Sequence, residues 1–541
     1  MNPTPEDIAK AVAEEEAKRV NLPAGPPVPA FLDMAEALKP HLSRKAVAVH
    51  ALVAPQPAPE RPLRFEMAHV ADGATLAERS WQEGDVFHLD FGRHLTGYLS
   101  YRVSPTGSVA DSPIRLRLTF GEVPTDVAEP LYPYRGWISA AWLPDETVTI
   151  DDLPADHWLP RRHAFRYVKV EILAASRRFG VRFENVSAHA VTAATSEPDM
   201  LPDTWPDWIR RVDHVSQLTL RDCLQTCFED GPRRDRRLWV GDLRLQALAN
   251  YVTFHADDVV KRCLYLFAGL PRSDGLVNGC VYERPVPTYA DTTTLDYAAL
   301  YCVTLQEYVE ATGDIPTGLD LWPVACRQID VLLARLDDDG LFVDNGETWC
   351  FIDWAFGLDK SASTHAVIVF ALRRMLLLGA AIGRPEHADN YRDAIARMTH
   401  AARTRLFDAE QGIYTSGPAR QVSCATQAWM VLAGIPESDG VAQAAIRNAL
   451  IDPTTVKPIT PYLYHYIAEA MLACGMRADA LELVRGYWGA MLDAGADTFW
   501  EAFDPADPLT SPYGDNHANS FCHAWSCSPT WLFRARELGE P

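Results

Sequence analysis

Several features that would point away from a globular enzyme are absent from this chain. No run of about 18 apolar residues occurs, so the sequence predicts no membrane-spanning helix. The first twenty residues are acidic with a helical pattern, and they lack the basic and then apolar order of a signal peptide. The eleven cysteines are an odd number without a CxxC pair, which argues against a disulfide scaffold and a zinc site. We therefore expect a cytoplasmic protein with free thiols and no metal or other cofactor.

Basic blocks are also missing. Lysine and arginine total 50 against 72 aspartate and glutamate residues, which gives the 541-residue chain a formal net charge of −22. This balance repels phosphate backbones and anionic lipid, so neither nucleic acid nor a membrane is expected as a partner. Disordered chains have few hydrophobic and aromatic residues, whereas this chain is 48% hydrophobic and 10% aromatic. The composition therefore predicts a folded enzyme with more than one domain.

Residues 45–200 have the sequence pattern of a β domain. Apolar and polar residues alternate strictly over residues 114–120 and again over residues 168–172, and turn-forming clusters separate such runs. Short strands with a period of two and frequent turns predict an antiparallel β-sandwich. Ahead of it, residues 1–44 form a predicted helical extension, with one amphipathic helix over residues 5–20.

From residue 201 to residue 541 the hydrophobic period changes to about 3.6, which is typical of helices. No repeat of fixed period is visible, which disfavours a helical solenoid. The pattern predicts about twelve helices, beginning near residues 207, 243, 257, 293, 319, 361, 385, 422, 439, 461, 477 and 526. Twelve helices joined by short loops predict an (α/α)6 barrel, although an open helical array would have the same number of helices.

The loops between these helices are rich in tryptophan, carboxylates and histidine, at residues 230–242, 349–354, 497–501 and 520–525. Loops are usually small and polar, so this composition suggests a pocket that stacks on a sugar ring and binds its hydroxyl groups. Hydrolysis of a glycosidic bond needs two carboxyl groups, one to protonate the leaving oxygen and one to activate water. The first and third loops supply them, although aspartates among arginines are also typical of an ion-pair network at a helix start.

The segment DGPRRDRRLWVGD at residues 230–242 resembles the signature of glycoside hydrolase family 78, the bacterial and fungal α-L-rhamnosidases. The usual form of that signature is D-C-P-x-R-(D)-E-x-L-G-W-x-G-D. Two later segments are similar to the family's T-T-x-W-E and S-x-x-H-x-(W/Y) loops, namely DTFWE at 497–501 and SFCHAW at 520–525. Four more segments resemble family motifs in the family's order: LDFGRHLTGY at 89–98, FGE at 120–122, FRYV at 165–168 and TPYLYHY at 460–466.

This resemblance implies an inverting hydrolase that releases terminal non-reducing α-L-rhamnose from a rhamnose-containing oligosaccharide or glycoside, with no metal needed. It places Asp235 in the slot of the general acid and Glu501 in the slot of the general base that activates water. It also implies that the site lies in an (α/α)6 barrel. The residues expected to bind or frame the rhamnose ring are Asp230, Arg234, Trp239, Asp242, Asp353, Trp354, Trp500 and His523.

The chain departs from the family's pattern in the acid slot, where Asp235 replaces the usual glutamate and is one methylene shorter. Gly231 also stands where the family has cysteine. Two alternatives stay open: the same fold acting on a different glycoside, and a catalytically weak carbohydrate-binding protein. Exposed sandwich edges would permit a homodimer, but no residue pattern specifies one.

Overall fold

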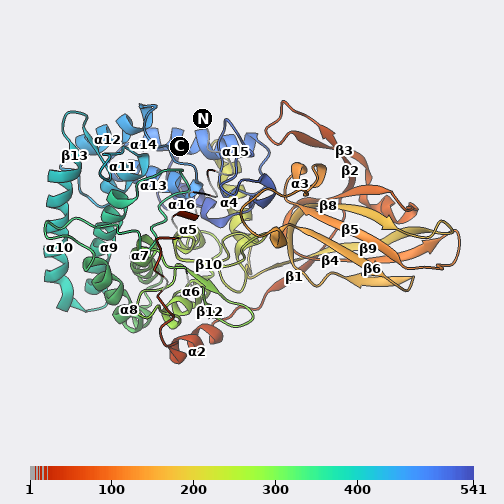
Figure 1. Cartoon of the computed structure of the whole chain (residues 1–541), viewed down its shortest axis with the longest axis horizontal. Coiled ribbons are helices and arrows are strands. Elements are labelled where there is room, and N and C mark those ends of the chain that lie inside the picture. The colour runs from red at the N-terminus through yellow and green to blue at the C-terminus, as the bar shows by residue number, and fades with distance from the viewer. Residues whose placement is uncertain are drawn as a thin grey trace.

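The computed structural model describes residues 22–290 and 292–540, together with residues 7, 10, 13, 14 and 17–20. A sheet domain and a helical domain lie side by side (Figure 1). Most of the helix predicted over residues 5–20 lies outside the described residues. Helix α2 (Pro29–Ala37) packs on α6 (Asp257–Gly269), so this part of the N-terminal extension contacts the helical domain before the chain enters the sheet.

The sheet domain is built from antiparallel strands, as predicted. Hydrogen bonds link them in the order β1-β9-β4-β8-β5-β6, while β2 and β7 also pair with β4, and β3 pairs with β2. The strands are β1 (Ser43–Ala48), β2 (Ala51–Pro57), β3 (Phe65–Asp72), β4 (Val86–Thr106), β5 (Ile114–Gly121), β6 (Asp145–Ile150), β7 (Ala155–Trp158), β8 (His163–Ala174) and β9 (Gly180–Thr192).

Alternation along β5 explains how the sheet forms its core. Ile114, Leu116, Leu118 and Phe120 are at most 1% exposed, whereas the intervening Arg115 is exposed. Successive side chains of a strand point to opposite faces, so every second residue of this run enters the core. The period-two pattern read from the sequence is therefore confirmed.

The long strand β4 joins the strands of this domain into one hydrogen-bonded antiparallel sheet. Its first part pairs with β2 and β8, and its second part pairs with β7 and β9. The register against β8 shifts between Asp90 and Leu95. Such irregularities bend a strand and redirect its side chains, and here the shift turns part of β4 toward the helical domain.

The helical domain follows from Asp207 onward. Six of its helices, α4, α6, α9, α12, α13 and α14, begin at the predicted residue. The helices besides α6 are α4 (Asp207–Cys223), α5 (Val240–Asn250), α7 (Leu295–Thr312), α8 (Ile315–Leu333), α9 (Ser361–Ala381), α10 (Ala388–Ala401), α11 (Cys424–Leu432), α12 (Asp439–Ile451), α13 (Pro461–Ala473), α14 (Arg477–Val484), α15 (Ala490–Asp493) and α16 (Pro529–Arg534).

Alternate helices of this domain pack on one another in sequence. Helix α5 contacts α7, α7 contacts α9, α9 contacts α11 and α11 contacts α13. The short 3₁₀ helix η7 (Ala524–Ser526) contacts both α13 and α5. Helices α8, α10, α12 and α14 each pack against a member of this series. Every residue of α5 is buried, whereas α10 buries only one face, so the series forms the interior of the domain.

Helix α9 is the one described helix long and apolar enough to cross a membrane by length and composition. Its most apolar window is 67% buried inside the protein, and α9 packs against α7, α8, α10 and α11. A core helix of a helical domain has the same composition, because it is surrounded by other apolar surfaces. Packing therefore accounts for its apolar character.

Candidate active site

Asp230 closes the loop between α4 and α5. Its N–H donates to the Arg237 carbonyl at 2.9 Å, and its carboxylate accepts from the Arg237 N–H at 3.0 Å. Arg236 has a φ of 62°, in the left-handed region that a tight turn requires. The Asp230 carbonyl also accepts from the Ala524 N–H at 2.9 Å. The loop at residues 230–237 is therefore bonded to the loop that precedes α16, far away in the sequence.

Glu501 presents a buried carboxylate to this loop. Its Oε2 accepts from Arg234 Nη2 at 2.6 Å and from the Ser520 N–H at 3.4 Å, and its Oε1 accepts from the Tyr513 hydroxyl. His523 Nδ1 lies 3.9 Å from the same Oε2. Only 3% of Glu501 is exposed, so protein groups define the position of this carboxylate.

Arg234 joins the two predicted catalytic carboxylates. While Nη2 binds Glu501, Nη1 donates to Asp235 Oδ1 at 3.3 Å and Nε donates to the Ala518 carbonyl at 2.9 Å. The guanidinium also lies over the Tyr513 ring at 4.1 Å. Arg237 lies 3.7 Å from the other Asp235 oxygen. Asp235 is therefore flanked by two cations, and 18% of its side chain stays exposed.

A second buried pair, Asp242 and His523, stands behind Glu501. Asp242 lies in the first turn of α5, and its Oδ1 is 3.1 Å from His523 Nε2. Burial raises the pKa of Asp242, and the hydrogen bond to His523 opposes that rise. Burial alone lowers the pKa of His523, but attraction to Glu501 and Asp242 outweighs it and raises that pKa above its ordinary value. The pair therefore favours a charged imidazole next to the Glu501 carboxylate.

Asp230 is the most strongly perturbed acid of this cluster. Burial raises its pKa well above the ordinary value, and the negative charges of Asp235 and Asp242 add to the effect. His523 and the Arg237 N–H work in the opposite direction. A buried acid beside other acids tends to keep its proton, so Asp230 is suited to donate a hydrogen bond to a hydroxyl group.

Aromatic side chains border the cluster on two sides. Trp239, on the short strand β10 (Leu238–Trp239), meets Tyr297 edge to face at 6.5 Å. Trp354 meets Tyr513 edge to face at 6.0 Å, and both tryptophans are half-buried. Exposed ring faces of this kind can pack against the apolar side of a sugar. The loops thus bring together Asp230, Arg234, Asp235, Trp239, Asp242, Trp354, Glu501 and His523.

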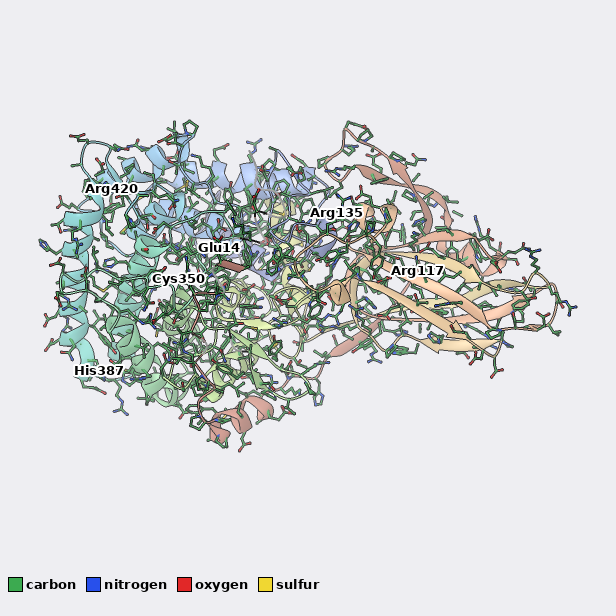
Figure 2. The ribbon with its side chains drawn as sticks, viewed as in Figure 1. Glu14, Arg117, Arg135, Cys350, His387 and Arg420 are labelled. Carbon is green, nitrogen blue, oxygen red and sulfur yellow. The ribbon has the colours of Figure 1, made fainter. Side chains whose placement is uncertain are left out.

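A cavity of about 1590 Å³ opens beside this cluster rather than directly over it. Asp353, Trp354 and the residues on either side of Tyr513 line it, whereas Asp235 and Glu501 are not among its described lining residues. Glu14, Arg135 and Cys350, which also line it, are labelled in Figure 2. We place the candidate site at the carboxylates, because hydrolysis of a glycosidic bond requires two carboxyl groups. We regard the cavity as the route by which a substrate would reach them.

Two predicted site residues have other tasks in this structure. Asp353 accepts hydrogen bonds from Thr460 Oγ1 at 2.6 Å and from the N–H groups of Ile459 and Thr460, which holds the start of α13. Burial raises the pKa of Asp353 to about 6. Trp500 is 1% exposed and packs edge to face against Phe503 and Phe521. Its indole therefore belongs to the core, apart from the cluster.

Sequence reasoning missed two groups that hold Glu501. Tyr513 bonds the carboxylate directly, yet it lies in a stretch of loop, residues 504–519, with no periodic pattern. Ser520 accepts the Glu501 N–H through its carbonyl at 3.0 Å. The segment that contains Ser520 was predicted to be part of the site, but the residue expected to act there was His523. A tyrosine among glycine and proline in a loop is a weak signal, because nothing local shows which way it points.

One group of described residues has ligand atoms close enough for a metal: His94, Asp222 and Cys522. His94 Nδ1 is 2.7 Å from Asp222 Oδ2, and His94 Nε2 is 3.0 Å from Glu122 Oε1. Each ring nitrogen therefore has a carboxylate partner. A charged imidazole accounts for these contacts without a metal, since both nitrogens then donate.

Comparison with known proteins agrees with this arrangement. A family model described as glycosyl hydrolase family 78 alpha-rhamnosidase N-terminal domain matches residues 49–190. A second, the bacterial alpha-L-rhamnosidase 6 hairpin glycosidase domain, matches residues 204–535. These two matches, one to the sheet domain and one to the helical domain, define a glycosidase. The chain belongs to glycoside hydrolase family 78, the α-L-rhamnosidases, which act on rhamnosides.

Solved structures of rhamnosidases resemble most of the chain. One from Klebsiella oxytoca with rhamnose bound is 43% identical, with a TM-score of 0.92 over 95% of this chain and 99% of its own. The family 78 rhamnosidase of Bacillus sp. GL1 is 22% identical, with a TM-score of 0.73 over 87% of this chain and 49% of its own. The latter supports the fold alone. No curated protein matches the chain.

Proposed function

We propose that the enzyme hydrolyses terminal non-reducing α-L-rhamnosides with inversion, using Asp235 as the general acid and Glu501 as the general base. The observation that carries the proposal is the shared Arg234 guanidinium, which binds both carboxylates. The rhamnose bound to the Klebsiella oxytoca relative supports the choice of sugar. No metal or other cofactor takes part in the proposed reaction.

The spacing of the two carboxylates is compatible with inversion. Bonds of 3.3 and 2.6 Å to the two ends of one planar guanidinium keep the bonded oxygens within about 8 Å of each other. Inverting glycosidases need roughly 6.5–9.5 Å between their carboxyl groups, because a water molecule lies between the base and the sugar. The same limit of about 8 Å also admits the roughly 5–5.5 Å of a retaining enzyme, so the anomer that is formed first is the test of inversion.

The surroundings of each carboxylate suit its proposed role. Glu501 is buried beside the permanent cation Arg234, a setting that suits a carboxylate acting as base. Asp235 is more exposed, so a leaving group entering from solvent can reach it. In this scheme Glu501 removes a proton from water as the water attacks the anomeric carbon, and Asp235 gives its proton to the departing oxygen.

The remaining predicted residues would hold the sugar. Asp230, Asp242 and His523 line the buried side of the cluster and would bind hydroxyl groups, while Trp239 and Trp354 would pack against the ring and its methyl group. Asp353 would act from the cavity side, since it lines that space. Trp500 would act indirectly, by fixing the loop that carries Glu501.

We also infer that the helical domain is an (α/α)6 barrel. The series α5, α7, α9, α11, α13 and η7 supports this, because η7 contacts both α13 and α5 and so brings the two ends of the series together. The outer helices α8, α10, α12 and α14 pack on the series. All eleven cysteines are free and buried, which supports a reducing compartment such as the cytoplasm. A homodimer would leave this scheme unchanged, since the chain supplies the proposed catalytic groups itself.

Release of nitrophenol from an aryl α-L-rhamnoside tests the proposal. We expect Glu501→Gln to lose most of this activity, and Asp235→Asn to lose most of its activity on a rhamnoside whose leaving group is a sugar. The matched surface variant Asp389→Asn should keep both activities, because Asp389 is exposed on α10. Activity on other aryl glycosides but not on rhamnosides would mean that the fold acts on another sugar. Sugar binding without turnover, unaffected by both substitutions, would indicate a carbohydrate-binding protein instead.

A further inference from the structure

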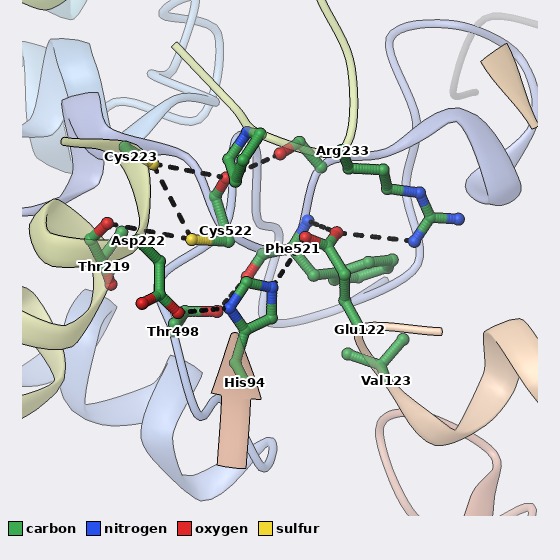
Figure 3. A network of polar contacts seen from close by, with 12 residues as sticks. His94, Glu122, Val123, Thr219, Asp222, Cys223, Arg233, Thr498, Phe521 and Cys522 are labelled. Atoms are coloured by element: carbon green, nitrogen blue, oxygen red, sulfur yellow. Dashed lines mark hydrogen bonds and ion pairs between the residues drawn. The ribbon is translucent and has the colours of Figure 1, made fainter. Parts of the chain in front are cut away.

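One buried carboxylate of the sheet domain, Glu122, reaches both loops of the candidate site. It follows β5, and its side chain is fully buried. Its Oε2 accepts from the Phe521 N–H at 2.7 Å and lies 3.4 Å from Arg233 Nη1. Its Oε1 is 3.0 Å from His94 Nε2 (Figure 3). A single residue thus touches the loop at 230–237 and the loop at 520–525.

The contact with Phe521 leads directly to Glu501. The Phe521 N–H and the Ser520 carbonyl belong to the same peptide group, which is planar and rigid. Glu122 binds the N–H side of this group, and the carbonyl side accepts the Glu501 N–H at 3.0 Å. The Ser520 N–H in turn donates to the Glu501 carboxylate at 3.4 Å. Rotation of this peptide would therefore move the backbone contact that positions the proposed base.

The contact with Arg233 leads to the other half of the site. Arg233 Nη2 donates to Asp126 Oδ1 at 3.0 Å and to the His517 carbonyl at 2.9 Å. Asp126 lies on α3 (Pro124–Ala128), a short helix of the sheet domain that follows Glu122. Arg234, the residue that follows Arg233 in the chain, binds Asp235 and Glu501. Fixing Arg233 to the sheet domain thus fixes the backbone from which Arg234 projects.

Glu122 is itself held by a closed network of charges. His94 lies between Glu122 and Asp222, with Asp222 Oδ2 2.7 Å from Nδ1 (Figure 3). Burial alone lowers the pKa of His94, but Cys522, Asp222 and Glu122 together raise it well above its ordinary value. His94 lies where the register of β4 shifts, which turns its side chain out of the sheet toward α4. The sheet domain thus supplies both a cation, His94, and a carboxylate, Glu122, to its interface with the helical domain.

We propose that Glu122 is a positioning residue for the rhamnosidase reaction: through the Ser520–Phe521 peptide and Arg233, the sheet domain sets the placement of Glu501 and Arg234. The inference rests on the function proposed above. It assigns the sheet domain a part in catalysis, because a displacement of about 1 Å in a catalytic group can cost on the order of a hundredfold in rate.

A matched pair of variants separates positioning from simple domain adhesion. Glu122→Gln and Asp222→Asn each replace one carboxylate of the same buried imidazole with an amide of the same size. Of the two, only Glu122 also contacts Phe521 and Arg233. The side chain of Asp222 contacts His94 and Arg221, and Arg221 lies on the same helix as Asp222, α4. We expect Glu122→Gln to lower kcat on an aryl α-L-rhamnoside by roughly tenfold to a hundredfold with little change in KM. Asp222→Asn should lower kcat less than threefold, while both variants lose similar thermal stability.

Equal losses of kcat in the two variants, with wild-type enzyme active, would overturn this inference alone. An inactive wild-type enzyme would overturn the proposed function together with it. If Glu122→Gln does not fold, Arg233→Lys provides the second test, because it keeps the charge but loses the two-pronged contact with Asp126 and His517. We expect a fall in kcat at unchanged KM there too, and an unchanged kcat would contradict the proposal.

Discussion

Asp235 and Glu501 share one guanidinium, yet their surroundings differ. Glu501 is 3% exposed and bound by Tyr513, by the Ser520 backbone and by Arg234, whose Nη2 lies 2.6 Å from Oε2. Asp235 is more open, and its charged contacts are longer, 3.3 Å to Arg234 and 3.7 Å to Arg237. The side of the site that we propose activates water is therefore held by more and shorter contacts than the side that we propose donates the proton. Fewer and longer contacts would let Asp235, whose side chain is one methylene shorter than that of glutamate, stay close to the oxygen of the leaving group.

The largest expected effect comes from removing the fixed carboxylate. Glu501→Gln should lower kcat on a nitrophenyl α-L-rhamnoside by about 10²–10⁴-fold, because it removes the carboxylate that we propose activates water. Asp235→Asn should cost much less on this substrate than on a rhamnoside whose leaving group is a sugar, because nitrophenolate leaves without needing a proton. Steady-state kinetics with both substrates would check this, and losses independent of the leaving group would contradict the role of Asp235 as acid.

The next effect concerns the cation between the two carboxylates. Arg234→Lys should lower kcat by about a hundredfold, because one ammonium group cannot bind Asp235, Glu501 and the Ala518 carbonyl together as the planar guanidinium does. Arg237→Lys is the matched control, since its charged contact with Asp235 is 3.7 Å and it does not bind Glu501. Similar losses of kcat in the two variants would show that Arg234 does not couple the two sides.

Asp353, a buried carboxylate outside this pair, sharpens the contrast because its bonds support the start of α13. Burial raises its folded pKa to about 6 from an ordinary 3.8, so the folded state keeps a proton that the unfolded state releases. Its stabilising contribution is therefore full below about pH 4 and is lost as the pH rises through about 6. Relative to Asp353→Asn, wild-type enzyme should lose about 2 kcal/mol of stability between pH 4 and pH 7.

Chemical unfolding of both proteins across this pH range would measure that difference. A constant gap between wild type and Asp353→Asn would show that Asp353 has the same pKa in both states. Such a result would weaken the view that its carboxyl group is buried at the end of α13.

The smallest effect should come from Tyr513→Phe. This change removes the hydroxyl bond to Glu501 but keeps the ring beneath Arg234 and against Trp354. We expect roughly a tenfold loss of kcat, which corresponds to the lower end of the value of one hydrogen bond to a charged group. Kinetics of Tyr513→Phe beside Tyr134→Phe, whose buried hydroxyl has no partner among the described residues, would isolate that bond. An unchanged kcat in Tyr513→Phe would contradict the tight hold on Glu501.

Local pattern predicted most of the scaffold, because burial imposes a period on the sequence. The alternating run of β5 is in the core, and α6, α9 and α13 begin where their periodic segments begin. The continuity of the sheet through β4 was not predicted, since the register shift at Asp90 to Leu95 leaves no periodic signal. The family motifs predicted that Asp235, Arg234 and Glu501 belong to one site. In the structure Arg234 binds both of the other two residues.

Side-chain direction and distant partners lay beyond what the sequence could indicate. Trp500 was expected at the sugar because it precedes Glu501, but its indole turns into the core. Tyr513 lies in a loop without a periodic pattern and binds Glu501 across 12 residues of sequence. Glu122 lies at the end of a strand and supports the peptide that binds Glu501, across 379 residues. Such contacts depend on how loops cross at the domain interface, which a period or a motif does not encode.

The stereochemistry of the first product tests the central claim most directly. Proton NMR during hydrolysis of an aryl α-L-rhamnoside, recorded before mutarotation, distinguishes the two anomers of free rhamnose. If Glu501 activates a water molecule on the face opposite Asp235, β-L-rhamnose appears first. Initial formation of α-L-rhamnose would contradict inversion and the assignment of Glu501 as a general base.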